Sequence, residues 1–284
     1  MKLHIIETGK FKLDGGAMFG VVPKSMWQKL NEPDANNLCT WSMRCLLVED
    51  GDRKILIDTG LGNKQSEKFR SHFHPHGIDS LDNSLANIGM AKDEITDVFL
   101  THLHFDHVGG AIYRDSNDNL LPSFPNAIYW SNEKHYNWAN NPNPREKASF
   151  LKENIQPLKD HGVLKFIDIE QGVSFTDHIK IDFVNGHTEA MMVPYITLDN
   201  GETIVFTADL LPSHCHIGMP YVMGYDIRPL ETLKEKALLY EKTVNTDHYI
   251  FFEHDKDMAL CQLNKNERGR VVLDKQIDIN EILK

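Results

Sequence analysis

The sequence lacks the features that mark secreted and membrane-spanning proteins. It has four cysteines in 284 residues and no C-x-x-C pair, which favours a reducing compartment over a disulfide scaffold. No apolar run reaches the length of a membrane-spanning helix, and the run at Leu3–Ile6 is too short for the core of a signal peptide. We therefore expect a cytoplasmic chain with no membrane partner, unless an export signal was removed from it.

Basic runs and linker-like segments are also missing. The formal net charge is −11, whereas nucleic-acid binding relies on clustered Lys and Arg, so we expect no nucleic-acid partner. With 41% hydrophobic and 25% charged residues, the composition is that of an ordinary globular protein. No stretch rich in Ser, Gly and Pro separates two parts, and we predict a single domain over residues 1–284 with mixed α and β structure.

One stretch, Val98–Gly110, joins a buried strand to a dense group of metal-binding side chains. The strand is followed within six residues by His102, His104, Asp106 and His107. Alternate side chains of an extended segment point the same way, so the first two histidines can converge on one ion while the remaining pair turns towards a second. The spacing indicates two metal ions, and the Gly-Gly that follows indicates a tight turn or a close backbone approach.

The chain repeats one arrangement twice: a hairpin, an aspartate, a helix, a strand and a histidine. The first copy comprises strands at 45–49 and 54–57, Asp58, a helix over 81–88, a strand at 98–100 and His102. The second copy comprises strands at 195–199 and 202–206, Asp209, a helix over 229–243, a strand at 249–252 and His254. The Gly-containing turns in both hairpins support this interpretation. We infer two similar halves whose strand ends face a common site.

The remaining segments complete the expected order of elements. We predict helices over 131–140 and 144–160, strands at 163–168 and 173–184, and a strand with a turn after His254. The Gly-rich, apolar segment 12–23 reads either as a loop that lines a pocket or as a plain hairpin turn, and it is also a candidate homodimer contact. Residues 226–231 are expected to cap the helix that follows.

Three further residues bring the candidate metal ligands to seven. His187 follows a predicted strand, and Asp209 and His254 end strands of the second half. The full set is His102, His104, Asp106, His107, His187, Asp209 and His254. Imidazole and carboxylate ligands without thiolate suit zinc first, and also iron, manganese or cobalt.

The order of these motifs resembles the metallo-β-lactamase superfamily of metal-dependent hydrolases, over nearly the whole chain. The resemblance implies an α+β fold, a four-layer αββα sandwich built of two similar halves. It also implies that His102, His104 and His187 hold one metal, that Asp106, His107 and His254 hold the second, and that Asp209 bridges them. Asp58 resembles the carboxylate that orients a ligand histidine in this family.

The ligand set further resembles that of acyl-homoserine lactonases and methyl-parathion-hydrolase-like members. It implies a hydrolase in which a hydroxide bridging two metals attacks a lactone, ester or phosphotriester of a small molecule, with Asp106 and Asp209 as the catalytic carboxylates. Two alternatives stay open: a thioester hydrolase of the glyoxalase II type, and a metal-binding or regulatory protein that keeps the fold without turnover.

Side chains for a substrate pocket are harder to assign from the sequence. The candidates are Met18, Phe19, Phe105, His214, Tyr221 and Tyr225, of which either tyrosine could supply a phenol beside the metals. A second histidine cluster, His72, His74 and His76, lies in a polar segment that contains a proline, and a loop or pocket-rim role is the simpler interpretation for it.

Overall fold

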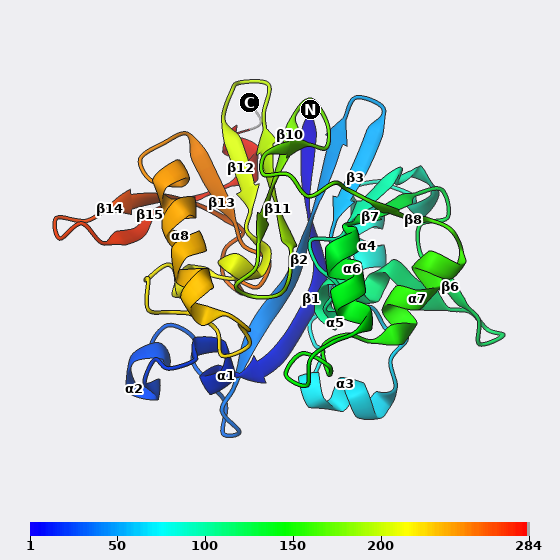
Figure 1. Cartoon of the computed structure of the whole chain (residues 1–284), viewed down its shortest axis with the longest axis horizontal. Coiled ribbons are helices and arrows are strands. Elements are labelled where there is room, and N and C mark those ends of the chain that lie inside the picture. Colours follow the sequence, from blue (N-terminus) through cyan, green and yellow to red (C-terminus); the bar gives the residue numbers. More distant parts are fainter. Residues whose placement is uncertain (283–284) are drawn as a thin grey trace. The chain divides into compact units, whose positions relative to one another are not determined.

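The structure is a computed structural model that describes residues 1–282 (Figure 1). The chain divides into two compact units, each made of two segments. The first comprises residues 1–10 and 43–169, and the second comprises residues 11–42 and 170–284 as far as they are described. Strands β1 (Lys2–Asp14) and β2 (Leu38–Asp50) contribute to both units, because the unit boundaries fall inside them.

The first unit is built on a six-stranded mixed sheet in the order β1-β2-β3-β4-β7-β8. Its other strands are β3 (Arg53–Ile57), β4 (Asp97–Phe99), β7 (Ile128–Ser131) and β8 (Leu164–Phe166). β2 and β3 form the antiparallel hairpin, while β3, β4, β7 and β8 pair in parallel. Parallel strands require crossover segments that cover the sheet, and here the crossovers carry the helices of the unit.

The helices and minor strands of the first unit lie in these crossovers. They are α3 (Glu67–Phe73), α4 (Leu81–Asn87), η1 (Lys92–Glu94), α5 (Phe105–Val108), η2 (Gly109–Ala111), β5 (Ile112–Arg114), β6 (Leu120–Pro122), α6 (Glu133–Asn140) and α7 (Lys152–Asp160). Leu56, Val98 and Tyr129 from three neighbouring strands pack with Leu85 of α4 and Leu158 of α7 in one buried cluster. This hydrophobic core holds β4, and therefore the histidine motif that follows it, in place.

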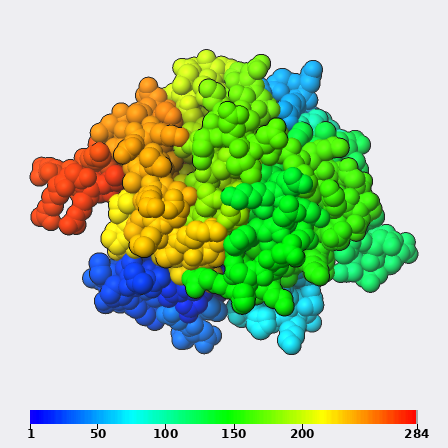
Figure 2. Space-filling model, in the orientation of Figure 1, coloured from blue at the N-terminus to red at the C-terminus, as the bar shows by residue number. Residues whose placement is uncertain are grey.

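The second unit is built on a seven-stranded mixed sheet in the order β15-β14-β13-β12-β11-β10-β9. The strands are β9 (Val173–Ser174), β10 (Ile179–Val184), β11 (Met191–Thr197), β12 (Thr203–Phe206), β13 (His248–Phe251), β14 (Leu260–Lys265) and β15 (Val271–Ile277). Its helices are α1 (Gly15–Phe19), α2 (Lys24–Trp27), η3 (Ala208–Leu210), η4 (His214–His216), α8 (Pro229–Thr243) and α9 (Ile279–Ile282). α8 packs on β13 and β14 (Figure 1), and the β14–β15 turn projects from the unit (Figure 2).

The two-copy pattern expected from the sequence is confirmed inside each unit. In the first unit a hairpin (β2–β3) is followed by α3, α4, η1 and then β4, which is parallel to β3. In the second unit a hairpin (β11–β12) is followed by α8 and by β13, which is parallel to β12. The strands expected after His254 are also present as β14 and β15. The single-domain prediction for 1–284 stays a prediction.

Two sequence-based expectations were wrong in detail. Segment 12–23 is not a loop throughout, since β1 extends to Asp14 and α1 follows it, with the Asp14 carboxylate accepting a hydrogen bond from the Ala17 N–H at 2.8 Å. The helix expected over 144–160 begins only at Lys152. Asn143 accepts hydrogen bonds from the N–H groups of Arg145 and Glu146, and this local turn ends before the helix begins.

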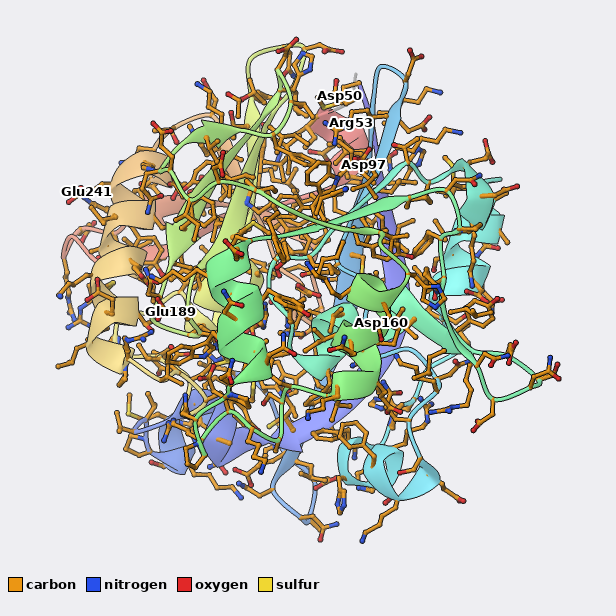
Figure 3. All side chains as sticks on the ribbon, turned by 45° about the vertical axis from the view of Figure 1, so that its right-hand side comes forward. Asp50, Arg53, Asp97, Asp160, Glu189 and Glu241 are labelled. Atoms are coloured by element: carbon orange, nitrogen blue, oxygen red, sulfur yellow. The ribbon has the colours of Figure 1, made fainter. Side chains whose placement is uncertain are left out.

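An ion pair between a partly exposed arginine and a buried aspartate joins β3 to β4 at the start of both strands (Figure 3). Arg53 donates two hydrogen bonds to Asp97, at 3.0 and 2.6 Å, and the Asp97 side chain is 6% exposed. Thr96 and Trp130 also donate to this carboxylate. Burial alone would raise the pKa of Asp97, but these hydrogen bonds outweigh it and the pKa lies below its usual value.

No helix of the described residues 1–282 is long and apolar enough to span a membrane.

We predict that Arg53→Ala lowers the free energy of unfolding by about 1.5–3 kcal/mol, because a buried carboxylate loses a charged hydrogen-bond partner. The control Lys54→Ala removes a more exposed ion pair to Glu94 and should cost less than about 1 kcal/mol. Because the folded-state pKa of Asp97 is lowered, its stabilisation is present above the unfolded pKa and is lost as the pH falls through the folded one. Urea unfolding of both variants at neutral and acidic pH measures this, and an equal loss at both pH values would contradict it.

Candidate metal site

The histidine motif of the first unit begins where β4 ends. His104 precedes the four-residue helix α5, and Asp106 and His107 lie within it. Asp58 lies just after β3, the strand that pairs with β4, and its N–H donates to the Phe99 carbonyl at 2.9 Å. The ends of two adjacent parallel strands thus bring Asp58 beside the motif.

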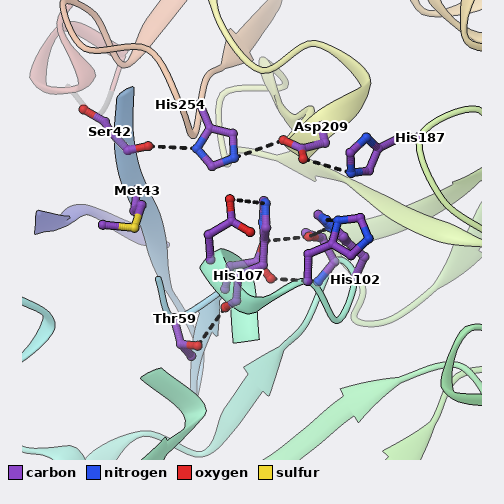
Figure 4. A network of polar contacts seen from close by, with 12 residues as sticks. Ser42, Met43, Thr59, His102, His107, His187, Asp209 and His254 are labelled. Atoms are coloured by element: carbon purple, nitrogen blue, oxygen red, sulfur yellow. Dashed lines mark hydrogen bonds and ion pairs between the residues drawn. The ribbon is translucent and has the colours of Figure 1, made fainter. Parts of the chain in front are cut away.

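Asp58 organises the motif through three hydrogen bonds. Its fully buried carboxylate accepts from the N–H and the hydroxyl of Thr101, at 2.8 and 2.6 Å, and pairs with Nδ1 of His107 at 3.1 Å. Thr59 adds a hydroxyl hydrogen bond to the His107 carbonyl at 2.7 Å (Figure 4). These contacts fix the His107 ring with Nδ1 towards the carboxylate, which leaves Nε2 as its ligand atom.

The other two imidazoles of the motif lie against each other. Nε2 of His102 is 3.0 Å from Nδ1 of His104, and the two side chains are almost entirely buried. Their ligand atoms are close enough to share one cation. Glu146 lies 3.7 Å from Nε2 of His104, on the other side of that ring.

The Gly-Gly after the motif is explained by a close backbone approach. A Cβ on Gly109 would lie 2.0 Å from the Leu61 carbonyl oxygen, and one on Gly110 would lie 2.2 Å from the Thr59 carbonyl oxygen. The buried Lys64 donates to the Gly109 carbonyl, and burial lowers the pKa of Lys64 to about 7. No larger residue fits at either glycine without moving the loop after β3.

In the second unit, the ligand candidates follow strands β10, β12 and β13. His187 comes after β10, Asp209 lies in the 3₁₀ turn after β12, and His254 comes after β13. Nε2 of His187 and Nε2 of His254 approach the two oxygens of Asp209, at 3.0 and 3.1 Å (Figure 4). Two buried imidazoles therefore point at one buried carboxylate.

The opposite nitrogen of each of these rings is held by another group. Nδ1 of His187 lies 2.9 Å from Asp226, which also accepts a hydrogen bond from the Thr232 hydroxyl at 2.7 Å. Nδ1 of His254 donates to the Ser42 carbonyl at 2.8 Å. Burial would lower the pKa of His187, but Asp209 and Asp226 raise it to about 10. Such anchoring fixes which nitrogen is presented for coordination.

The donor chemistry of both units fits divalent cations of the zinc type. The candidate ligands of each unit, all within the described residues, are imidazole nitrogens and carboxylate oxygens without a thiolate. All seven are at most 7% exposed. His107, His187 and His254 each have Nδ1 held by a carboxylate or a carbonyl, as metal-ligating histidines do. The arrangement can therefore hold metal ions while the hydrogen bonds that anchor these histidines stay in place.

The substrate-pocket candidates of the second unit lie mostly in and around α1. Met18 and Phe19 are buried, with the Phe19 ring stacked on Trp27 and on His216. His216 donates through Nε2 to the Met18 carbonyl at 3.0 Å, and Tyr221 meets the Phe19 ring edge-on. These contacts tie α1 to the segment that follows Asp209.

Other candidates are placed differently. Tyr225 is 37% exposed, and the side chain of His214 is a quarter exposed. In the first unit Phe105 is buried against Phe69 and Phe73 of α3. His72, His74 and His76 lie at the end of α3 and beyond it, and none of them belongs to a candidate metal-binding group among the described residues.

The expectation that residues 226–231 cap α8 was wrong for Asp226. The residue at the helix N-cap is Arg228, whose side chain makes no capping bond, and Pro229 opens the helix. Asp226 instead holds His187, a role that the sequence did not reveal because the two residues are 39 positions apart. The Ser42 carbonyl, which holds His254, carried no sequence signal at all, since every residue has a carbonyl.

The sequence profile of the metallo-beta-lactamase superfamily matches residues 44–246, and the chain belongs to this superfamily. Its fold is the metallo-beta-lactamase fold, α+β with two mixed sheets, as the resemblance of the sequence predicted.

Curated relatives and solved structures agree over most of the chain. An N-acyl homoserine lactonase of Bacillus thuringiensis is 23% identical over 266 residues, 89% of this chain and 93% of the relative. A structure described as a probable metal-dependent hydrolase from Staphylococcus aureus has a TM-score of 0.83 and 25% identity, covering 98% of each chain. AidC, a dizinc quorum-quenching lactonase, has a TM-score of 0.79 and 21% identity, covering 98% of this chain and 97% of its own.

We predict that Asp226→Asn weakens zinc binding about 10- to 100-fold, because loss of an outer-layer carboxylate usually costs that much in metal affinity. Competition against a chromophoric zinc chelator measures the change. Glu241→Gln, on the exposed side of α8 (Figure 3), is the matched control and should bind zinc as the wild type does. Equal zinc affinity in the wild type, Asp226→Asn and Glu241→Gln would show that Asp226 does not support metal binding.

Proposed function

We propose that this protein is a metal-dependent hydrolase that binds two divalent cations, most simply zinc, and hydrolyses a lactone, ester or phosphotriester of a small molecule. The observation that carries the proposal is the convergence of His187 and His254 on the two oxygens of Asp209, with both rings anchored from behind. A carboxylate that offers one oxygen to each of two imidazoles is suited to bridge two cations.

The proposed ligand assignment divides the seven residues between two ions. His102, His104 and His187 hold one ion, Asp106, His107 and His254 hold the other, and Asp209 contacts both. Support comes from the superfamily match, which covers every proposed ligand except His254, and from the resemblance to a lactonase described as dizinc. When bound, the two ions would supply a water of lowered pKa and stabilise negative charge on the substrate oxygen.

The remaining steps fall to side chains of this chain. Asp106 is placed at the start of α5 and is 7% exposed, and we propose that its carboxyl group passes a proton to the leaving oxygen. Asp58 and Asp226 keep His107 and His187 in the orientation that coordination needs. Met18, Phe19, Tyr221, Tyr225, His214 and Phe105 are proposed to contribute to the substrate pocket.

A lactone is the first substrate class to test. The curated relatives of this chain include N-acyl homoserine lactonases, and the similarity to them covers 89% of this chain. A thioester hydrolase of the glyoxalase II type would add a helical C-terminal region. The described residues after His254 instead form β14, β15 and the four-residue helix α9. We further propose that the partner is a small-molecule substrate and not a nucleic acid. We also propose that residues 12–23 contribute to a homodimer contact.

We expect Asp209→Ala to lose bound metal and hydrolytic activity together, because one side chain serves both ions. Metal content by mass spectrometry of the intact holoprotein is measured beside turnover of an N-acyl homoserine lactone, an aryl ester, a phosphotriester, a thioester and a β-lactam. The control Asp177→Ala changes an exposed aspartate in the turn between β9 and β10 and should keep both properties.

Two results would overturn the proposal. Full activity of Asp209→Ala would contradict the assignment of Asp209 as the carboxylate that contacts both ions. A wild-type protein that binds two metal ions but hydrolyses none of the five substrates would favour the non-catalytic alternative.

A further inference from the structure

A second group of reactive side chains lies outside the proposed metal ligands, in the turn η4 after Asp209. It comprises Cys215, His214 and Asp255 of the second unit. Nδ1 of His214 lies 2.5 Å from the Asp255 carboxylate, and Nε2 of the same ring lies 3.6 Å from the sulfur of Cys215. One imidazole thus stands between a carboxylate and a thiol, in the order that activates nucleophilic thiols.

The carboxylate is rigidly held and sets the orientation of the ring. Asp255 is 1% exposed, and its second oxygen accepts the N–H groups of Asp257 and Met258, while the first also accepts the N–H of His214 at 2.7 Å. Nδ1 of His214 must therefore carry a hydrogen, and Nε2 is turned to the sulfur. The hydrogen bond to Asp255 raises the pKa of His214 to about 10, so the ring is protonated at neutral pH and directs the hydrogen on Nε2 towards the sulfur of Cys215.

A second cysteine provides an internal comparison. The thiol of Cys215 donates to the Leu30 carbonyl at 3.5 Å, and the thiol of Cys39 donates to the next carbonyl, that of Asn31, at the same distance. Burial raises the pKa of Cys39 to about 11, and no histidine contact to that sulfur is found among the described residues. Cys39, Cys45 and Cys261 are 0% exposed, whereas Cys215 is 6% exposed beside a partly exposed His214.

We propose that Cys215 is the reactive thiol of this protein, activated by His214 and oriented through Asp255, and that it is a site of covalent modification by small electrophiles, hydroperoxides in particular. With hydrogen peroxide, the sulfur attacks one oxygen as the O–O bond breaks. The sulfur is oxidised to a sulfenic acid and the peroxide is reduced. The second oxygen leaves as hydroxide and takes up the proton held by His214 to become water, and the hydrogen lost from the Cys215 thiol replaces that proton on the ring.

The test is alkylation of the zinc-loaded, full-length protein with limiting iodoacetamide at neutral pH, followed by mass spectrometry of its peptides. We expect Cys215 to be alkylated at least about tenfold faster than each of the other three cysteines, because thiol reactivity follows access and a neighbouring cation or base. We expect His214→Gln to slow the reaction of Cys215 about tenfold.

The matched control is His4→Gln. His4 also pairs with a carboxylate, Glu49, at 2.8 Å, and its side chain is similarly exposed at 26%, but it lies in the other unit and no contact of its ring with a thiol is found in the part of the chain described. This variant should leave the rate at Cys215 unchanged. A rate at Cys215 no faster than at Cys39, or an undiminished rate in His214→Gln, would overturn the proposal.

A second measurement does not depend on the variant folding. If His214→Gln unfolds, all four cysteines become equally reactive, and the wild-type protein alone then decides. Wild-type protein treated with dilute hydrogen peroxide in the presence of dimedone should carry the sulfenic-acid adduct on Cys215 and not on Cys39. An adduct spread evenly over the cysteines, or absent from Cys215, would contradict the inference.

Discussion

The cost of burying polar rings and carboxylates governs the chemistry of this protein. Burying imidazole and carboxylate groups is unfavourable unless each is hydrogen-bonded or paired. The structure meets this requirement by holding Nδ1 of His107, His187 and His254 with Asp58, Asp226 and the Ser42 carbonyl respectively. The opposite nitrogens are thereby oriented inside each unit, and this preorganisation is what a metal site needs.

Both units place their acidic and histidine side chains by the same arrangement of strands. A hairpin is followed by a crossover, and the ends of two adjacent parallel strands, β3 and β4 in one unit and β12 and β13 in the other, present an acid and a histidine. The parallel pairing brings together residues far apart in the sequence, as Asp58 and Thr101 illustrate. The repetition explains why the ligand-bearing turns follow strand ends, while the helices cover the sheets.

The segment after Asp209 connects the proposed hydrolase site to the rest of the second unit. Lys236 of α8 is buried and donates to the carbonyls of His216, Gly218 and Tyr221, which fixes this segment against the helix. One fold can carry many activities, so function has to be argued from such segments rather than from the fold. The same segment carries Cys215, whose modification would therefore occur close in sequence to a proposed metal ligand.

Local sequence determined the features whose signal is local. The H-x-H-x-D-H motif, the two hairpins, the helix Pro229–Thr243 and the family were all evident from neighbouring residues and their order. The late start of α7 and the helix at Gly15–Phe19 escaped prediction, because hydrogen bonds that the Asn143 and Asp14 side chains accept from backbone N–H groups decide them. Only the tertiary structure assigned Asp226 to His187, Ser42 to His254 and Asp255 to the His214–Cys215 pair. Partners that lie 39, 212 and 41 positions apart leave no periodic trace in a sequence, since packing alone brings them within hydrogen-bond distance.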